Sequence, residues 1–182
     1  MKRIATVAAA TLSLALAAAP PVAFGADAPA ANPATPHEVG GAKGWTGYSY
    51  LDRGNKVCYL VGHPSKTEPA RAARGRIDAM VTERPREKQL NVVNFDAGYV
   101  FKEGSSATIE VDGHGFSLFT DHETAWARDA ATDGAVTEAL ARGRRAVLKG
   151  TNAKGVAVTQ SYSLDGFGDA LAAIDKACGM KR

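Results

Sequence analysis

The 182-residue chain contains only two cysteines, Cys58 and Cys178, and the second lies four residues from the C-terminus. In an oxidising compartment an isolated pair of this kind is most simply explained as a disulfide. The bond would close a loop of roughly 120 residues, for which chain-entropy reasoning gives at most about 4 to 5 kcal/mol of stabilisation. The alternatives are two separate buried thiols or a redox-active pair, although the chain has no C-x-x-C motif.

The local patterns around both cysteines favour the disulfide. Phe167, Leu171, Ile174 and Cys178 follow one another at steps of four, three and four residues, which places them on one face of a helix. Cys58 lies in the run KVCYLVG, where alternation predicts a strand that can direct this side chain inward. The sequence therefore predicts a C-terminal helix tied covalently to a sheet.

The N-terminus has the pattern of a secretory signal peptide, residues 1–25. Lys2 and Arg3 precede an apolar run from Ile4 to Ala19, and Ala23-Phe24-Gly25 offers small residues for cleavage after Gly25. The alternative is a membrane anchor, but the run ends at a Pro-Pro pair and is shorter than the roughly 20 apolar residues that a spanning helix needs. We therefore predict a periplasmic or secreted protein with no transmembrane segment after signal removal.

Two further regions follow the signal. Residues 26–43, rich in Ala, Pro and Gly and without periodicity, are predicted to form a disordered leader. Residues 44–182 have the size of one domain. The formal net charge of +3 falls to +1 once Lys2 and Arg3 are removed with the signal (3 − 2 = 1), so no nucleic-acid partner is expected.

The domain is predicted to be mainly β, with about eight or nine strands, mostly antiparallel because their connections are short. The clearest hairpin surrounds Asp112-Gly113. One helix is expected between Asp129 or Thr132, as alternative N-caps, and Gly143; a second is expected from Gly166 to Cys178. We predict a single-domain antiparallel β-sandwich or flattened barrel with two short helices, one of them C-terminal.

No pattern of catalytic residues emerges from the sequence, and we predict no enzyme activity, no cofactor and no metal site. The four histidines lack any recognised catalytic or metal-binding motif. Only Asp121-His122-Glu123 places a histidine among acids, and consecutive strand residues point to opposite faces. The alternative, an uncharacterised periplasmic enzyme or small-ligand carrier, would require a pocket lined by His122 and an acid. Trp45 and Trp126 are interpreted as core anchors rather than a ligand platform.

A basic run between residues 66 and 88 is the candidate interaction surface. Its acidic residues favour a solvated loop, whereas an anion-binding role would match an acidic lipid, a polysaccharide or a protein partner. The partner is thus an unknown protein or envelope component. The candidate residues are Lys66, Arg71, Arg74, Arg76, Arg84, Arg86 and Lys88.

Four stretches of the chain carry a family pattern: GWTGYSYLDRGNKVCYLVGHPSKTEP, AWARDAATDGAVTEALARG, VLKGT and YSLDGFGDALAAIDKACG. With these stretches the chain resembles the invasion-associated locus B (IalB) family of alphaproteobacterial exported proteins over nearly all of residues 44–182. The most specific features are Trp45 with Cys58 about a dozen residues on, and Ser163-Leu164-x-Gly166-Phe167 ahead of Cys178.

The resemblance implies a periplasmic or secreted, β-rich protein of a family linked in some pathogens to host-cell invasion. Many members carry four cysteines, whereas this chain has only Cys58 and Cys178. The family has no established catalytic residues, so the resemblance assigns none. The predicted function is that of an exported, non-enzymatic binding or envelope-associated protein.

Overall fold

The computed structural model describes residues 35–182. The predicted signal peptide, residues 1–25, and residues 26–34 of the predicted leader lie outside the described residues. Within residues 35–182 no helix is both long and apolar enough to cross a bilayer.

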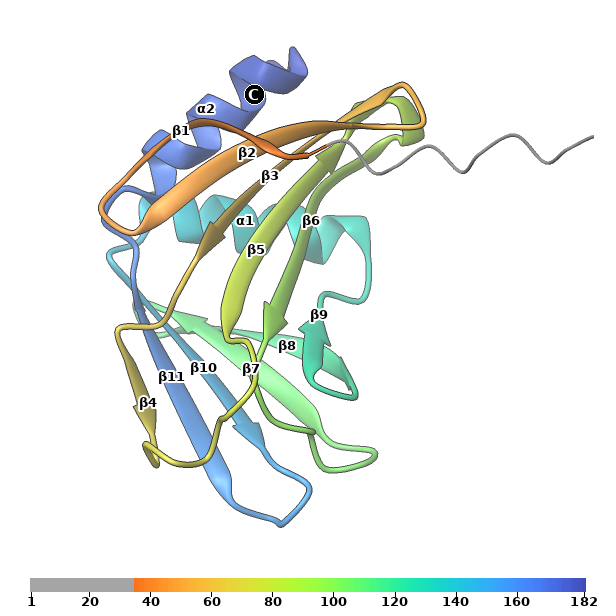
Figure 1. The fold of residues 1–182 in the computed structure, drawn as a ribbon. Helices are drawn as coiled ribbons and strands as arrows, with labels where there is room; N and C mark the ends of the chain where they lie inside the picture. Colours follow the sequence, from red (N-terminus) through yellow and green to blue (C-terminus); the bar gives the residue numbers. More distant parts are fainter. Residues whose placement is uncertain (1–34) are drawn as a thin grey trace, which may run out of the picture. The chain divides into compact units, whose positions relative to one another are not determined.

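The described chain forms one antiparallel sheet with two α-helices (Figure 1). The strand order is β1-β2-β3-β5-β6-β9-β8-β7-β10-β11-β4, with β1 and β4 as its two edges. The strands are β1 (His37–Ala42), β2 (Trp45–Asp52), β3 (Asn55–Gly62), β4 (Lys66–Glu68), β5 (Asp78–Arg84), β6 (Gln89–Asp96), β7 (Ser106–Val111), β8 (His114–Asp121), β9 (Thr124–Trp126), β10 (Arg145–Thr151) and β11 (Ala157–Ser163); the helices are the 3₁₀ helix η1 (Pro85–Glu87), α1 (Ala130–Arg142) and α2 (Phe167–Cys178).

The sheet folds over on itself, so that β5 and β6 face β7 and β10 across one hydrophobic core (Figure 1). The short strand β9 connects the two halves, because it pairs with β6 on one side and β8 on the other. Val81, Phe95, Ile109 and Leu148, one from each of the four facing strands, are almost completely buried. The predicted fold class is confirmed: a mostly β, antiparallel domain with two helices, although the sheet is not closed into a barrel.

The structure corrects the predicted boundary of the leader. Residues 37–42 were assigned to the disordered leader, but they form β1, which pairs with β2 from Trp45 to Ser49. The segment HEVGGA lacks the alternation of apolar residues that predicts a strand. Its strand conformation depends on pairing with β2 and on contact with α2, and neither neighbour is visible in the local sequence.

Helix α1 begins where the sequence predicted. Asp129 is the N-cap, and its side-chain oxygen accepts a hydrogen bond from Thr132 N at 2.7 Å, which satisfies one of the free N–H groups of the first turn. Asp133 accepts a second bond from Val93 N at 2.8 Å and so joins the helix to β6. The buried side chains Val136 and Leu140 pack the helix against the core.

Helix α2 packs against β1, β2 and β3. The predicted core face is confirmed, because Phe167, Leu171 and Ile174 are buried. A close approach to β2 requires glycine at position 47, where a Cβ atom would lie 2.8 Å from the Ile174 Cγ2 atom. Trp45 is a core anchor, as predicted: it is 3% exposed and meets the Phe167 ring edge-on, at 4.9 Å between centroids.

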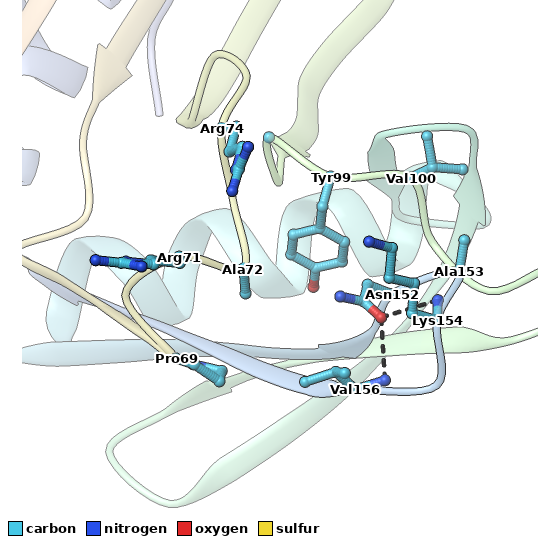
Figure 2. Close-up of a pocket in the computed structure, with 11 residues that line it drawn as sticks. Pro69, Arg71, Ala72, Arg74, Tyr99, Val100, Asn152, Ala153, Lys154 and Val156 are labelled. Carbon is cyan, nitrogen blue, oxygen red and sulfur yellow. Dashed lines mark hydrogen bonds between the residues drawn. The ribbon is translucent and has the colours of Figure 1, made fainter.

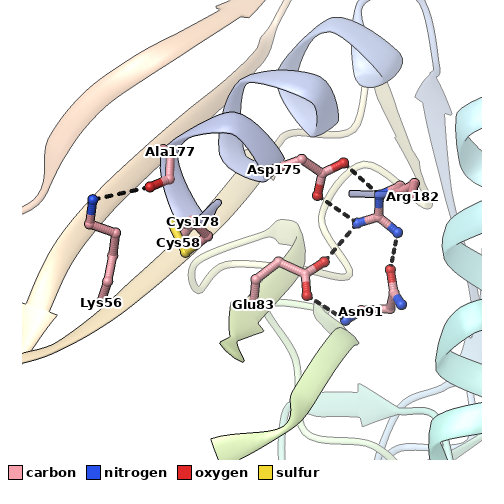
Figure 3. The surroundings of a disulfide bond; sticks show 8 residues. All are labelled: Lys56, Cys58, Glu83, Asn91, Asp175, Ala177, Cys178 and Arg182. Carbon is pink, nitrogen blue, oxygen red and sulfur yellow. Dashed lines mark hydrogen bonds and ion pairs between the residues drawn. A yellow bond between two sulfur atoms is a disulfide. The ribbon is translucent and has the colours of Figure 1, made fainter. Parts of the chain in front are cut away.

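A disulfide joins Cys58 of β3 to Cys178, the last residue of α2, as the sequence predicted (Figure 3). The two Cα atoms lie 6.1 Å apart, and the bond spans 120 residues of sequence. Beside it, Lys56 Nζ donates to the Ala177 carbonyl oxygen at 3.1 Å. The last helix is therefore fixed to the sheet by a covalent bond and a neighbouring hydrogen bond.

The sequence did not predict a second attachment of the C-terminus, which Arg182 makes to the fully buried carboxylate of Glu83 (Figure 3). Arg182 Nη2 donates to Glu83 Oε1 at 2.7 Å, and Arg182 Nε donates to Asp175 Oδ2 at 2.6 Å. The other oxygen of Glu83 accepts from Asn91 N at 2.9 Å. Burial raises the pKa of Glu83, and the bonds from Asn91 and Arg182 oppose this increase.

Replacing Cys58 by serine should lower the melting temperature by roughly 10 °C, because the loss of a long loop closure costs about 4 kcal/mol. Differential scanning calorimetry of the oxidised protein under non-reducing conditions measures the change. Cys178→Ser should have the same effect, and adding it to Cys58→Ser should cost little more. An unchanged melting temperature in the single variants would refute the structural role of the bond.

Replacing Arg182 by alanine should destabilise the protein by about 1–2 kcal/mol, because it leaves the buried Glu83 carboxylate without its cation; the partial exposure of Arg182 reduces the cost. The raised pKa of Glu83 means that the unfolded chain loses this proton first as pH rises, so the group favours the native state less at higher pH. Removing Arg182 takes away a group that lowers the pKa of Glu83, so the variant loses more stability as pH rises than the unmodified protein does. The difference in melting temperature between the two proteins should therefore widen from about pH 4 to pH 7. Lys181→Ala, an exposed neighbour, is the control and should give no such trend.

Candidate functional site

A hollow with basic walls lies where three segments distant in sequence meet (Figure 2). We call it the basic hollow and define it by Arg71, Arg74, Tyr99, Asn152 and Lys154, which are among its lining residues. The segments are the connection from β4 to β5, the chain that follows β6, and the turn between β10 and β11. Its volume of about 640 Å³ falls within the range of roughly 300–1,000 Å³ that is usual for ligand pockets.

Backbone hydrogen bonds hold the walls of the basic hollow in place. Arg74 N and Gly75 N both donate to the Gly98 carbonyl oxygen, at 2.9 and 3.0 Å. On the opposite side, Ala153 N donates to the Val100 carbonyl oxygen at 2.8 Å. The segment 98–100 therefore fixes the loop that carries the arginines and the turn that carries Lys154.

The turn between β10 and β11 is shaped by the side chain of Asn152. Its Oδ1 atom accepts from Lys154 N and from Val156 N, each at 3.0 Å (Figure 2). Asparagine commonly organises turns in this way. The result is a defined turn that presents the Lys154 side chain at the edge of the hollow.

Tyr99 lies in the middle of the basic hollow and points its phenol group into it (Figure 2). The side chain packs edge-on against Phe101, with 4.9 Å between the ring centroids. Burial raises the pKa of Tyr99 to about 12, so the phenol remains a neutral hydrogen-bond donor at physiological pH. Gly150 permits this packing, because a Cβ atom there would lie 2.7 Å from the Tyr99 hydroxyl and 2.5 Å from Phe101 Cε1.

The basic hollow concentrates positive charge without compensating acids. Arg71, Arg74 and Lys154 contribute three cations, and no aspartate or glutamate is among its lining residues. Within residues 35–182 none of the three lies within ion-pair distance of a carboxylate. The Lys66–Glu68 pair on β4, at 2.7 Å, lies outside the lining. Chemically, the hollow presents free cationic donors and a phenol O–H to an anionic group.

The seven basic residues predicted to form one interaction surface lie at several separate positions in the structure. Arg71 and Arg74 line the basic hollow. Lys66 pairs with Glu68, Arg76 with Asp78, and Arg84 with Asp52 at 3.1 Å. Arg86 lies in η1 and Lys88 forms its C-cap, at the far end of β5, roughly 20 Å from Arg74 given about 3.3 Å per strand residue. The seven therefore form no single surface: Arg71 and Arg74 share the basic hollow, whereas Arg76 and Arg84 line a different hollow.

Lys154 is the functional candidate that sequence reasoning missed. It belongs to the turn between β10 and β11, where a lysine followed by glycine is an ordinary solvent-exposed turn residue. The local sequence contains no sign that this turn lies next to the loop after β4. That proximity depends on β4 adding to β11 at the edge of the sheet.

The predicted alternative site around His122 is not assembled within the described residues. His122 Nδ1 lies 2.8 Å from Asp121 Oδ1, but the two side chains are 88% and 71% exposed. His122 does not line the basic hollow or any of four other hollows in residues 35–182. In the same part of the chain, no cluster of three or more His, Cys, Asp or Glu residues has a geometry suited to a metal ion.

The fold and the basic hollow together define a class: a disulfide-closed, mainly β domain that offers an open cationic hollow at one edge of its sheet. Comparison with protein families places the chain more specifically, because the family model described as Invasion associated locus B (IalB) protein matches residues 45–175. The chain belongs to this family. No match is found among curated proteins or among solved structures.

Replacing Gly150 by alanine should destabilise the protein by about 1–3 kcal/mol, because the new methyl group would displace Tyr99 and Phe101. The thermal midpoint and the near-ultraviolet circular dichroism of the aromatic residues measure this effect. Gly115→Ala is a matched control in β8, where the nearest atom to a Cβ would be 3.4 Å away, and it should leave both readings nearly unchanged. Equal effects of the two substitutions would contradict the proposed packing below the hollow.

Proposed function

We propose that this protein is an exported, non-enzymatic binding protein of the bacterial envelope, periplasmic or secreted, and that its basic hollow takes an anionic group of an envelope component. The observation that carries the proposal is that Arg71, Arg74 and Lys154 line one hollow with Tyr99, and that none of the three is paired with a carboxylate within residues 35–182. Membership of the IalB family supports a link to invasion-associated proteins.

Several features support the exported location. The N-terminal pattern of residues 1–25 is that of a secretory signal. The disulfide between Cys58 and Cys178 is of the kind that persists in oxidising compartments and is rare in the cytosol. The alphaproteobacterial envelope is the setting that the family resemblance suggests.

The chemistry of the basic hollow favours phosphate or carboxylate as the bound group. Guanidinium groups such as those of Arg71 and Arg74 bind both oxygens of an anion in a forked geometry, whereas Lys154 acts as a point charge. Tyr99 adds a neutral O–H donor, since its pKa is raised to about 12. The formal charge of the mature chain is near zero, so attraction depends on this local cluster rather than on the whole surface.

The alternative function, a periplasmic enzyme or small-ligand carrier, receives no comparable support. It was motivated by Asp121-His122-Glu123 and required a pocket lined by His122 and an acid. In residues 35–182 these side chains lie at an exposed turn outside the hollows, so we retain the binding protein as the proposed function.

A charge-neutralised variant tests the proposal. Replacing Arg71, Arg74 and Lys154 together by glutamine should weaken binding to vesicles of phosphatidylglycerol about 100-fold, because each basic side chain near an anionic surface contributes about 1 kcal/mol. Cosedimentation with these vesicles, with phosphatidylcholine vesicles as the neutral reference, gives the measurement. Competition by free inorganic phosphate distinguishes recognition of the anion itself from recognition of a lipid surface.

The matched control neutralises Arg86, Lys88 and Lys176, which carry the same total charge but lie outside the basic hollow. This variant should bind nearly as well as the unmodified protein. An equal loss in both variants would mean that overall charge alone governs binding. Full binding by the Arg71, Arg74 and Lys154 variant would refute the role of the hollow.

A further inference from the structure

A second concave surface lies on the outer face of the sheet and differs in chemistry from the basic hollow. We call it the outer groove and define it by Tyr50, Tyr59, Met80, Asn94 and Trp126, which are among its lining residues. Its volume is about 810 Å³. The side chain of Met80 points away from the core because its neighbours Ala79 and Val81 are buried and successive strand residues alternate between faces.

The aromatic side chains of the outer groove are held in a fixed arrangement. Tyr59 stacks on Tyr48 with 5.3 Å between ring centroids, and it meets Tyr50 edge-on at 6.2 Å. These contacts run between β2 and β3, which pair along their whole length. Trp126 was predicted to be a core anchor like Trp45, but it is half-buried and lines this groove.

Two polar groups in the outer groove have no partner within the described residues. Trp45 donates its indole N–H to the Ser163 carbonyl oxygen at 2.8 Å, whereas the indole N–H of Trp126 meets no acceptor in residues 35–182. Asn94 is 7% exposed, and its side-chain amide forms no hydrogen bond within the described residues either. The two residues are direct partners in the pairing of β6 with β9, so their free donors lie side by side.

The arginines that line the outer groove are already paired with carboxylates, whereas Asp96, which also lines it, accepts only a hydrogen bond from Thr124 Oγ1 at 2.9 Å. Arg76 pairs with Asp78, and Arg84 pairs with Asp52 at 3.1 Å and with Glu87 at 3.6 Å. An anionic ligand would have to compete with these carboxylates, which distinguishes this surface from the basic hollow. Within residues 35–182 the groove therefore offers aromatic faces, the Trp126 N–H and the Asn94 amide, beside the carboxylate of Asp96.

The chain itself places a proline against this surface. Thr35 and Pro36, which immediately precede β1, are among the residues that line the outer groove. A Thr-Pro step is biased toward extended or polyproline II backbone. The groove therefore accommodates a proline ring and extended backbone beside its aromatic side chains.

We propose that the outer groove binds an extended, proline-containing peptide segment of a partner protein. A polyproline II segment has no internal hydrogen bonds and leaves its carbonyl oxygens free, so it presents acceptors to the Trp126 indole N–H and the Asn94 amide. Proline rings pack on aromatic side chains in grooves of this kind. The order of such a segment before binding reduces the entropy lost on association.

Fluorescence anisotropy with a labelled synthetic peptide of repeated Thr-Pro-Ala units tests the proposal on the mature protein. The peptide should bind, and a control peptide with every proline replaced by alanine should bind at least about tenfold more weakly. Trp126→Phe, which keeps an aromatic face and removes the N–H, should weaken binding about tenfold. Asn94→Ala should have a similar effect, and circular dichroism checks that each variant is folded.

Tyr48→Phe is the matched control, because Tyr48 stacks on Tyr59 but is not among the residues that line the groove; it should leave binding unchanged. Equal binding of the two peptides, or binding that neither Trp126→Phe nor Asn94→Ala weakens, would overturn the proposal. Absence of peptide binding would also overturn it. A concentration-dependent dimer that Trp126→Phe abolishes, without peptide binding, would assign the groove to a second copy of the chain instead.

Discussion

The bond between Cys58 and Cys178 connects the interior of the sheet to the last helix, and the packing of α2 depends on this attachment. Helix α2 covers one face of β1, β2 and β3. Without it, Trp45 and Gly47 of β2 would lose their contacts with Phe167 and Ile174. The helix has only 12 residues, and isolated helices of that length are marginal in water. The disulfide and the Arg182–Glu83 pair compensate by holding both the helix and the residues after it against the sheet.

Because α2 covers one face of β2 and β3, their other face is left for the aromatic row of Tyr48, Tyr50 and Tyr59. The far end of the folded sheet, where β4 adds to β11, carries the basic hollow. The two concave surfaces therefore differ in the charge that remains free. In the basic hollow the cations have no carboxylate partner within residues 35–182, which suits an anion. The arginines of the outer groove are already paired with carboxylates and leave aromatic faces and neutral donors.

Much of the fold could be predicted from local signals. The Asp112-Gly113 turn, the Asp129 cap and the apolar spacing of the C-terminal helix each act within a few residues, and the structure confirms all three. The edges of the sheet are β1, whose residues were assigned to the leader, and β4, whose residues fall in the run interpreted as a solvated loop. Edge strands are stabilised on one side only, and their formation depends on partners far along the chain, so their own residues carry a weak pattern.

The candidate surfaces were less predictable, because each is assembled from segments brought together by the folded sheet. The seven basic residues were read as one surface from their proximity in sequence, yet β5 separates Arg74 from Arg86 by its full length. Lys154 joins Arg71 and Arg74 only through the pairing of β11 with β4. Trp126 was expected in the core, but its neighbour Ala125 occupies the buried position of the three-residue strand β9. Because successive strand residues alternate between faces, Trp126 lies on the outer face.

By itself, the sequence determined the antiparallel class of the fold, the pairing of its two cysteines and the secondary structure apart from the edge strands β1 and β4. These properties follow from residue periodicity, turn chemistry and cysteine count, which are local or countable. Only the tertiary structure decided that the sheet folds over and stays open, and which side chains of residues 35–182 line the basic hollow and the outer groove. Those outcomes depend on long-range strand pairing and on which side chains reach a neighbour, and neither is encoded in the spacing of nearby residues.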